Sequence, residues 1–520
     1  MVREFSRTKN SLLNLLMGVV GQTLTVLLSF LVRTVFIRSL GPSYLGIDGL
    51  FTNILSLLSL AELGFETAIN YRLYRPIAEG DDAKVRKYLH FYRKVYYVVG
   101  AVVFILGIFF LPFLSFFVKD FNKLGELGIN ASQIFLLYLI NSVSSYLFFA
   151  YKSIILRAKQ KQYILDITGL LIIVISSIVK IVFLLYYSSF IGYVIIVIAF
   201  CILQNLVNAI VAHKYYPIYF QKEDEKLSKE DIKGVFKDCA ALLVYKVNNA
   251  VMQATDNLVL STFIGLVTVG LYSNYLLVFM AIRKLLQKAF ESIKASMGNL
   301  FASDDMEKKY FFFEITNYLT IVLYGTASIA FAVEINEFIS CWIGVKYILP
   351  QPLPILMGVE LLLTGMKLNL AQIREISGVF RQMWFRPVWG SCLNLFFSIL
   401  LVNYVGISGV VLGTIIAALF ANLAIDPYVI HKFTFNECKT VSNYYTNQIV
   451  YSLVLFLIGI VTYYISRHFF IGMGLLSFVV HVLLSVIMSI LLIVIFFWRR
   501  KECVFLRNKI VYILKRNRTY

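Results

Sequence analysis

Two apolar segments carry polar side chains whose spacing places them along one face of a helix. Residues 12–37 and 238–262 are each long enough to cross a membrane, yet each contains amide, hydroxyl and charged groups. Their recurrence at i, i+3, i+7 and i+11 matches the 3.6-residue period of an α-helix. The first stripe consists of Gln22, Thr25, Ser29 and Arg33, and the second of Lys246, Asn249, Gln253 and Asn257. Because hydrocarbon offers no hydrogen-bond partners, we expect both stripes to face protein or a water-filled cavity.

The cations in these stripes are the first candidates for ligand binding. A charge at the centre of a membrane helix costs roughly 2.5–3.5 kcal/mol on insertion scales, so its retention suggests a role. Arg33 and Lys246 would attract an anionic group such as a phosphate, which arginine can bind through two parallel hydrogen bonds. An interhelical salt bridge, or snorkelling of the side chain to the interface, would also explain them.

Two further cations fall inside apolar segments. Arg38 and Asp48 flank the short turn at Gly41, and a simple surface pair would explain both as well as a cavity role would. Lys180 lies past the middle of its segment, after two serines, and either lines the cavity or snorkels outward.

The acids within apolar segments are candidates for coupling to an ion. Asp256 lies beside the second stripe, and Glu62 lies near the end of the segment 44–64. A buried carboxylate can take up a proton or coordinate Na⁺. The alternative is a structural role, for Asp256 as the partner of Lys246. On residues 351–372 and beyond, Glu360, Thr364, Lys367 and Arg374 also share a face.

Enzyme, metal and nucleic-acid functions are not supported by the motifs. The chain contains no GxxxxGK[ST], HExxH or GxSxG sequence, and its six cysteines and five histidines are scattered without a CxxC pair. We therefore expect no catalytic residue, no metal site and no cofactor. The formal charge of +19 would suggest nucleic acid in a soluble chain, but here the basic residues lie in short loops between apolar segments. A retained first helix is expected, rather than a cleaved signal peptide.

Fourteen apolar segments have the length of about 20 residues that spans the hydrocarbon core. They are 12–37, 44–64, 95–117, 129–150, 167–188, 190–213, 238–262, 268–290, 312–334, 351–372, 386–404, 407–430, 446–466 and 474–498. The Lys and Arg residues fall almost entirely in alternate loops; the opposite loops hold only Lys119, Lys123, Lys346 and Arg467. The positive-inside rule then makes both termini cytoplasmic. The sequence thus predicts an all-α, multi-pass membrane protein with fourteen transmembrane helices.

An internal repeat divides the chain. A shift of 224 residues superposes Gly41-x-x-x-x-Gly46 on Gly265-x-x-x-x-Gly270 and carries the first polar stripe onto the second. Equivalent helices run in the same direction, so the repeat is parallel, as in many transporters that hold substrate between their repeats. The domains expected are a six-helix lobe 1–216, a charged cytoplasmic linker 217–236, a six-helix lobe 237–432, an extra helix pair 433–498 and a basic tail 499–520.

Two stretches resemble a known family. SFLVRTVFIRSLGPSYLGIDGLFTNILSLLSLAELGF, from Ser29 to Phe65, is similar to the polysaccharide transporter family of bacterial membrane proteins. ATDNLVLSTFIGLVTVGLYSNY, from Ala254 to Tyr275, resembles the start of that family's second lobe. This family contains the O-antigen and capsule repeat-unit flippases, within the multidrug/oligosaccharidyl-lipid/polysaccharide flippase superfamily.

The resemblance implies the two-lobed fold of multidrug exporters and lipid II flippases, with a central cavity that opens alternately to either side. It also implies an undecaprenyl-diphosphate-linked oligosaccharide as cargo, moved from the inner to the outer leaflet of the bacterial cytoplasmic membrane. H⁺ or Na⁺, membrane lipids and the polysaccharide polymerase machinery are the other expected partners. A cation-coupled exporter of small drugs is the alternative in the same fold, and a polyprenyl-dependent enzyme is a third.

Overall fold

The computed structural model describes residues 2–58, 65–117, 130–221, 226–301, 305–379, 381–383, 385–435, 440–469 and 475–516. Within these ranges every regular element is a helix, so the predicted all-α class is confirmed. Contacts between residues divide the chain into two compact units, Met1–Gly270 and Leu271–Tyr520.

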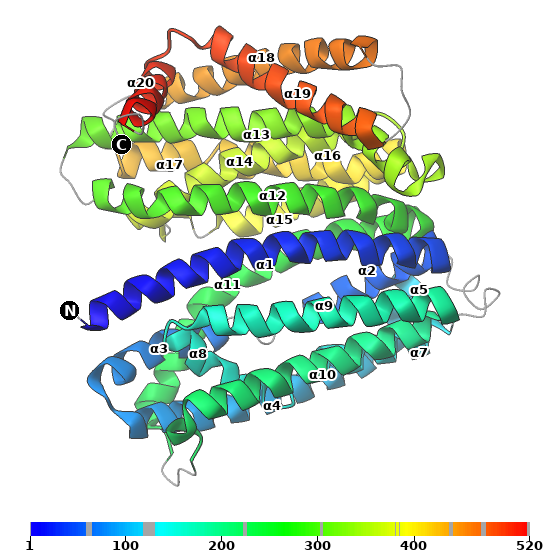
Figure 1. Ribbon diagram of the computed structural model, residues 1–520, viewed down its shortest axis with the longest axis vertical. Coiled ribbons are helices and arrows are strands. Elements are labelled where there is room, and N and C mark those ends of the chain that lie inside the picture. Colours follow the sequence, from blue (N-terminus) through cyan, green and yellow to red (C-terminus); the bar gives the residue numbers. More distant parts are fainter. Residues whose placement is uncertain are drawn as a thin grey trace. The chain divides into compact units, whose positions relative to one another are not determined.

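The first unit is built from helices that pack side by side along much of their length. Helix α9 packs against both α1 and α10, and these three run alongside one another (Figure 1). The α-helices of this unit are α1 Val2–Leu40, α2 Pro42–Leu58, α3 Phe65–Glu79, α4 Asp82–Phe110, α5 Leu114–Phe117, α7 Ala131–Ser144, α8 Ile154–Ala158, α9 Gln162–Tyr187, α10 Phe190–Tyr215 and α11 Lys229–Phe263. Short 3₁₀ turns are η2 Leu111–Phe113, η3 Ala150–Ser153 and η4 Pro217–Phe220.

The second unit begins within α12, and its long helix α13 packs against α14, α18 and α19. Its α-helices are α12 Leu266–Phe301, α13 Met306–Ile343, α14 Leu353–Ser377, α15 Arg386–Val405, α16 Ile407–Ala417, α17 Asp426–Phe433, α18 Val441–Phe469, α19 Leu475–Phe496 and α20 Lys501–Arg516. The short elements are η5 Val345–Tyr347, η6 Arg381–Met383 and the π-helical turn η7 Ala418–Leu423.

Eleven helices among the described residues are long and apolar enough to cross a membrane. Each overlaps one of the fourteen predicted segments. The predicted segments without such a helix are 44–64, 129–150 and 238–262. In the structure these contain α2 with 17 residues, α7 with 14 residues and part of α11 with 35 residues. The chain is therefore a multi-pass membrane protein, while the count of fourteen stays a prediction.

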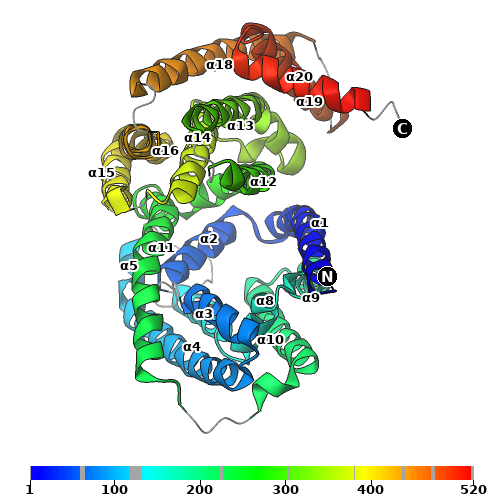
Figure 2. The same ribbon diagram turned by 90° about the vertical axis from the view of Figure 1, so that its left-hand side faces the viewer.

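Helix α11 belongs to the first unit because it packs along α2 and α3 (Figure 2). The unit boundary therefore falls at residue 270, after the second predicted stripe rather than before it. Part of the predicted linker 217–236 is itself helical, since η4 occupies its start and α11 begins at Lys229. The domain boundaries of the sequence analysis remain predictions.

The start of α11 is fixed by an N-terminal cap and by polar side chains of α3 and α4, which lie between the predicted segments 44–64 and 95–117. The Ser228 hydroxyl accepts a hydrogen bond from the Asp231 N–H at 3.0 Å, which satisfies one of the free donors of the first turn. Asp231 then accepts from the Tyr88 hydroxyl at 2.9 Å and forms an ion pair with Lys84 at 3.7 Å. Two turns further on, Asp238 pairs with Arg72 at 2.7 Å. These contacts hold the first turns of α11 against α3 and α4.

The repeated glycines form a reciprocal contact between α2 and the first turn of α12. Gly41 and Gly265 have φ angles of +89° and +126°, a left-handed region that glycine enters without strain, and each sits between two helices. A Cβ on Gly46 would lie 2.1 Å from the carbonyl oxygen of Leu266, and a Cβ on Gly270 would lie 2.2 Å from that of Pro42. The shift of 224 residues converts one contact into the other. Contacts related in this way are those of a local two-fold axis.

We expect Gly46→Ala to destabilise the protein, because the new methyl group would overlap a backbone carbonyl that no side-chain rotation can move. Overpacking of this kind costs about 1–3 kcal/mol or more. Thermal unfolding in detergent would measure the loss. Gly49→Ala is the matched control, since its Cβ would lie 3.9 Å from a methyl group of Val269, an ordinary contact. Equal stability of the two variants would contradict the reciprocal contact.

Asp231 lies before the predicted membrane segment of α11, and its environment gives a pH dependence. Burial opposes ionisation of Asp231, but hydrogen bonds from Ser228 and Tyr88 and the charges of Lys84 and Arg72 hold its pKa below the usual range. A lowered folded-state pKa contributes stability above the usual carboxyl pKa of about 3.9, and this is lost as pH falls through the lowered value.

Asp231→Asn should therefore lower stability by about 1 kcal/mol at pH 7, and the difference from the parent protein should shrink below about pH 3. Melting temperatures at both pH values measure this effect. Glu230→Gln, at an exposed neighbouring position, is the control. A difference that stays constant with pH would show that the charge of Asp231 is not involved.

Candidate functional site

The structure of the first unit brings two of the predicted cations to one carboxylate. Arg33 of α1 and Lys180 of α9 both interact electrostatically with Asp48 of α2. The three helices supply one charged group each, and α9 packs against α1. Two cations to one acid leave this group with an excess positive charge.

Two tyrosines complete the surroundings of these charges. The Tyr138 hydroxyl of α7 donates a hydrogen bond to Asp48 Oδ1. The ring of Tyr193, on α10, lies 5.8 Å from Lys180 Nζ and packs edge-on against Phe36 at a centroid distance of 5.0 Å. A cation over an aromatic face gains attraction from the ring quadrupole. Five helices of the first unit thus contribute to one polar group, which we call the Asp48 cluster: Arg33, Asp48, Tyr138, Lys180 and Tyr193.

The sequence analysis considered Asp48 as the surface partner of Arg38, but the structure gives Asp48 other neighbours. It bonds to Tyr138 and faces Arg33 and Lys180, whereas Arg38 is exposed at the end of α1. The reason is helical periodicity: Arg38 is five residues beyond Arg33, about 140° around the helix. The predicted role of Arg38 stays a prediction.

The remaining residues of the first stripe lie along α1 and are partly buried. Ser29 donates its hydroxyl hydrogen bond to the Thr25 carbonyl oxygen at 2.7 Å, so this hydroxyl is satisfied within its own helix. Gln22 lies one turn before Thr25 and is also partly buried.

The second stripe lies on α11, but the side chains of Lys246, Asn249, Gln253 and Asn257 fall outside the described residues, as does Glu62. Asp256 is partly buried on α11 and interacts with another group. The predicted roles of these residues therefore stay predictions.

Sequence reasoning missed a second polar group in this unit. Thr168 of α9 donates to Asn208 Oδ1 of α10 at 2.8 Å, and Gln204 donates to the same oxygen at 3.0 Å. Gln204 and Asn208 are one turn apart, an i, i+4 spacing that could have identified them as a face.

The second unit repeats the pattern of one acid with two cations. Glu360, predicted to share a face with Lys367, interacts electrostatically with Lys367 and with Arg283 of α12. Near the end of α14, Asp426 forms ion pairs with Arg374 and Arg386, each at 3.2 Å. Asp426 is only 1% exposed, so the group formed by Asp426, Arg374 and Arg386 is enclosed. It holds the ends of α14, α15 and α17 together.

An apolar pocket of about 400 Å³ opens in the second unit between α14, η7 and α18. Its lining is mostly aliphatic, with tyrosine, glutamine and serine side chains from α18. The lining residues are Leu363, Met366, Leu419, Leu423, Ala424, Tyr444, Tyr445, Gln448, Ile449, Ser452 and Leu453.

Removal of the Tyr138 hydroxyl tests the coupling within the Asp48 cluster. Tyr138→Phe should destabilise the protein by about 1.5–3 kcal/mol, the range for a hydrogen bond to a charged group. In Asp48→Ala the same tyrosine substitution should have a much smaller effect, because its acceptor is gone. Thermal unfolding of the four combinations measures the coupling, and Tyr186→Phe on exposed Tyr186 is the control. Additive effects would place the hydroxyl outside the cluster.

Solved structures with a similar fold are membrane transporters. The lipid II flippase MurJ in an inward closed conformation matches with a TM-score of 0.63 at 13% identity, covering 93% of this chain and 98% of its own. An inward-facing multidrug resistance MATE family transporter of the MOP superfamily matches with a TM-score of 0.60 at 15% identity, covering 81% and 96%. A MATE structure in a bent conformation has a TM-score of 0.51 at 16% identity, covering 83% and 97%. Identities this low establish the fold alone.

At the level of sequence, no curated protein matches. The family described as polysaccharide biosynthesis protein matches residues 11–292, which is more than half of the chain and includes the whole Asp48 cluster. The chain therefore belongs to the polysaccharide biosynthesis protein family, and its fold is similar to those of the lipid II flippase MurJ and the MATE transporters.

Proposed function

We propose that this protein is a flippase that moves an undecaprenyl-diphosphate-linked oligosaccharide from the inner to the outer leaflet of the bacterial cytoplasmic membrane. The observation that carries the proposal is the excess positive charge of the Asp48 cluster, whose cations Arg33 and Lys180 lie on two helices that are long and apolar enough to cross a membrane. Family membership in polysaccharide biosynthesis and the flippase fold support it.

The diphosphate is the charged part of this cargo, and its transfer into hydrocarbon is unfavourable unless cations of the protein compensate it. Arg33 and Lys180 can receive phosphate oxygens, with arginine binding two at once and lysine acting as a point charge. Asp48 holds both cations when cargo is absent, and Tyr138 keeps the carboxylate in place. Cargo phosphate would share these cations with Asp48, and its negative charge would balance their excess positive charge while the Asp48 carboxylate keeps its partners.

The hydrocarbon tail requires a different surface. The pocket between α14, η7 and α18 is lined mainly by aliphatic side chains and suits a polyprenyl chain rather than a sugar. Helix α18, which supplies the tyrosine, glutamine and serine side chains of this pocket, thereby acquires a role in holding lipid.

Alternating access, in which the cargo site opens first to the cytoplasm and then outward, is the proposed mechanism. Both termini are placed in the cytoplasm by the distribution of basic residues. Asp256 and Glu62 are the proposed sites of coupling to H⁺ or Na⁺. The polysaccharide polymerase machinery is the proposed recipient of the product.

Arg33→Ala tests the proposal directly. The loss of a charge-assisted, two-pronged phosphate contact of about 1.5–3 kcal/mol should slow flipping roughly ten- to a hundredfold. Cells carrying the variant should accumulate an undecaprenyl-diphosphate oligosaccharide inside and lose surface polysaccharide, measured by mass spectrometry of extracted lipids and by surface glycan staining. Lys180→Ala should act in the same direction.

Arg75→Ala is the matched control, because Arg75 is exposed on α3 and pairs with Glu79. The amount of each variant in the membrane must equal that of the parent protein. Normal surface polysaccharide with Arg33→Ala would remove the Asp48 cluster from the transport path.

Cation-coupled export of small drugs is the second candidate function, favoured by the likeness to a multidrug resistance MATE family transporter. Drug sensitivity on deletion, with lipid-linked oligosaccharide and surface glycan unchanged, would support that function and contradict the flippase.

A further inference from the structure

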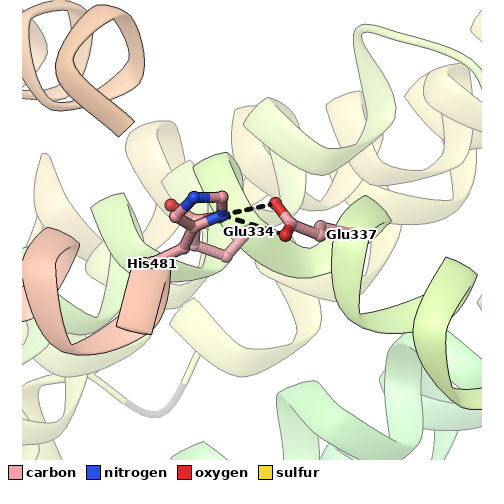
Figure 3. A group of neighbouring side chains, drawn as sticks. All are labelled: Glu334, Glu337 and His481. Atoms are coloured by element: carbon pink, nitrogen blue, oxygen red, sulfur yellow. Dashed lines mark hydrogen bonds and ion pairs between the residues drawn. The ribbon is translucent and has the colours of Figure 1, made fainter. Parts of the chain in front are cut away.

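A cluster of ligating side chains joins α13 to α19 in the second unit, apart from the Asp48 cluster and the apolar pocket. Glu334 and Glu337 lie one turn apart on α13, and His481 lies on α19. One ligand atom from each of the three residues lies within 4.8 Å of the other two. Figure 3 shows the His481 ring directed at the Glu337 carboxylate, with His481 Nδ1 at 2.9 and 3.0 Å from the two Glu337 oxygens.

The charges of this cluster do not balance. Two carboxylates face one imidazole, so even a protonated His481 leaves a net negative charge. Glu334 is 3% exposed and His481 is 5% exposed, so water has little access to the Glu334 carboxylate, while the Glu337 side chain is 17% exposed. A buried, uncompensated carboxylate is strongly unfavourable. A bound cation would supply the missing positive charge.

Hydroxyl groups from two helices hold one of the carboxylates in place. Ser466 of α18 and Ser485 of α19 donate to Glu334 Oε1 at 2.8 and 2.6 Å. Metal-binding carboxylates are typically oriented by such outer hydrogen bonds. Along α19, Ser477 lies one turn before His481 on the same face, 8% exposed, and its hydroxyl has no partner among the described residues.

We propose that Glu334, Glu337 and His481 form a binding site for a divalent transition-metal ion of the Zn²⁺ class. Imidazole nitrogen and carboxylate oxygen are ordinary zinc donors, at about 2.0–2.2 Å from the ion. Two such donors in a tetrahedral site lie about 3.3 Å apart, so small side-chain rotations bring these three atoms into range. His481 exchanges its hydrogen bond to Glu337 for the ion.

The site gives the C-terminal helix pair a function of its own. The ion would bind α19 to α13, with α18 supporting it through Ser466. The scattered cysteines and histidines predicted no metal site, because this ligand set uses a single histidine and two glutamates, whose spacing carries no zinc signature.

Zinc binding by the purified full-length protein tests the site without any transport assay, so its failure and that of the flippase are distinguishable. The protein should carry an affinity tag without histidine and be stripped with a chelator that is then removed. After equilibration with Zn²⁺ and gel filtration, the metal is counted by mass spectrometry. We expect one ion per chain at micromolar free Zn²⁺ and a rise in melting temperature.

Glu337→Gln and His481→Ala should lose this ion. His468→Ala, at an exposed histidine on α18, should keep it. Ser485→Ala removes a supporting hydrogen bond without removing a ligand, and should weaken zinc affinity roughly ten- to a hundredfold. Should the ligand variants fail to fold, the zinc affinity of Ser485→Ala still tests the site.

Absence of zinc from the parent protein, or equal zinc in the parent protein and in Ser485→Ala at limiting metal, would overturn the site. The cluster would then be a hydrogen-bonded contact between helices, stabilising the fold without an ion.

Discussion

The absence of hydrogen-bond partners in hydrocarbon is the constraint on which this structure depends. A charge carried into the membrane must find its partner within the protein. Among the residues that the structure describes, three acids each face two cations: Asp48, Glu360 and Asp426. One acid per two cations gives each of these groups, counted alone, an excess of one positive charge. The nearby anion offsets part of the cost of burying each cation.

The three groups differ in what that excess charge can do. Asp426 is enclosed and joins three helix ends, so its arginines are committed to holding the structure. In the Asp48 cluster the charged members are partly buried and Tyr138 is buried, and the members come from five different helices. In the proposed function, a phosphate bound to Arg33 and Lys180 would alter contacts between helices rather than within one. Binding of the anion and rearrangement of the helices would thereby be linked through the same few bonds.

The sequence was sufficient for the all-α class and for the eleven apolar segments that match described helices, because both depend on local composition and periodicity. It could not identify the partners of Arg33. Tyr138 and Tyr193 lie in apolar helices where a tyrosine resembles a core residue, and only packing shows that one hydroxyl reaches Asp48. Glu337 and His481 are 144 positions apart, so no spacing rule connects them. Asp48 looked like part of a surface pair because its neighbours in sequence, rather than in space, were the available guide.

The glycine repeat was visible in the sequence for a physical reason. A backbone-to-backbone contact between α2 and α12 requires a residue without Cβ on each side. The Gly-x-x-x-x-Gly motif therefore occurs twice, 224 positions apart. The contact leaves no room for a Cβ at Gly46 or Gly270, whereas hydrophobic side chains beside it, such as Val269, are ordinary core residues. The turns at Gly41 and Gly265 connect α2 and the first turn of α12 directly to α1 and α11, the two helices that carry the predicted polar stripes.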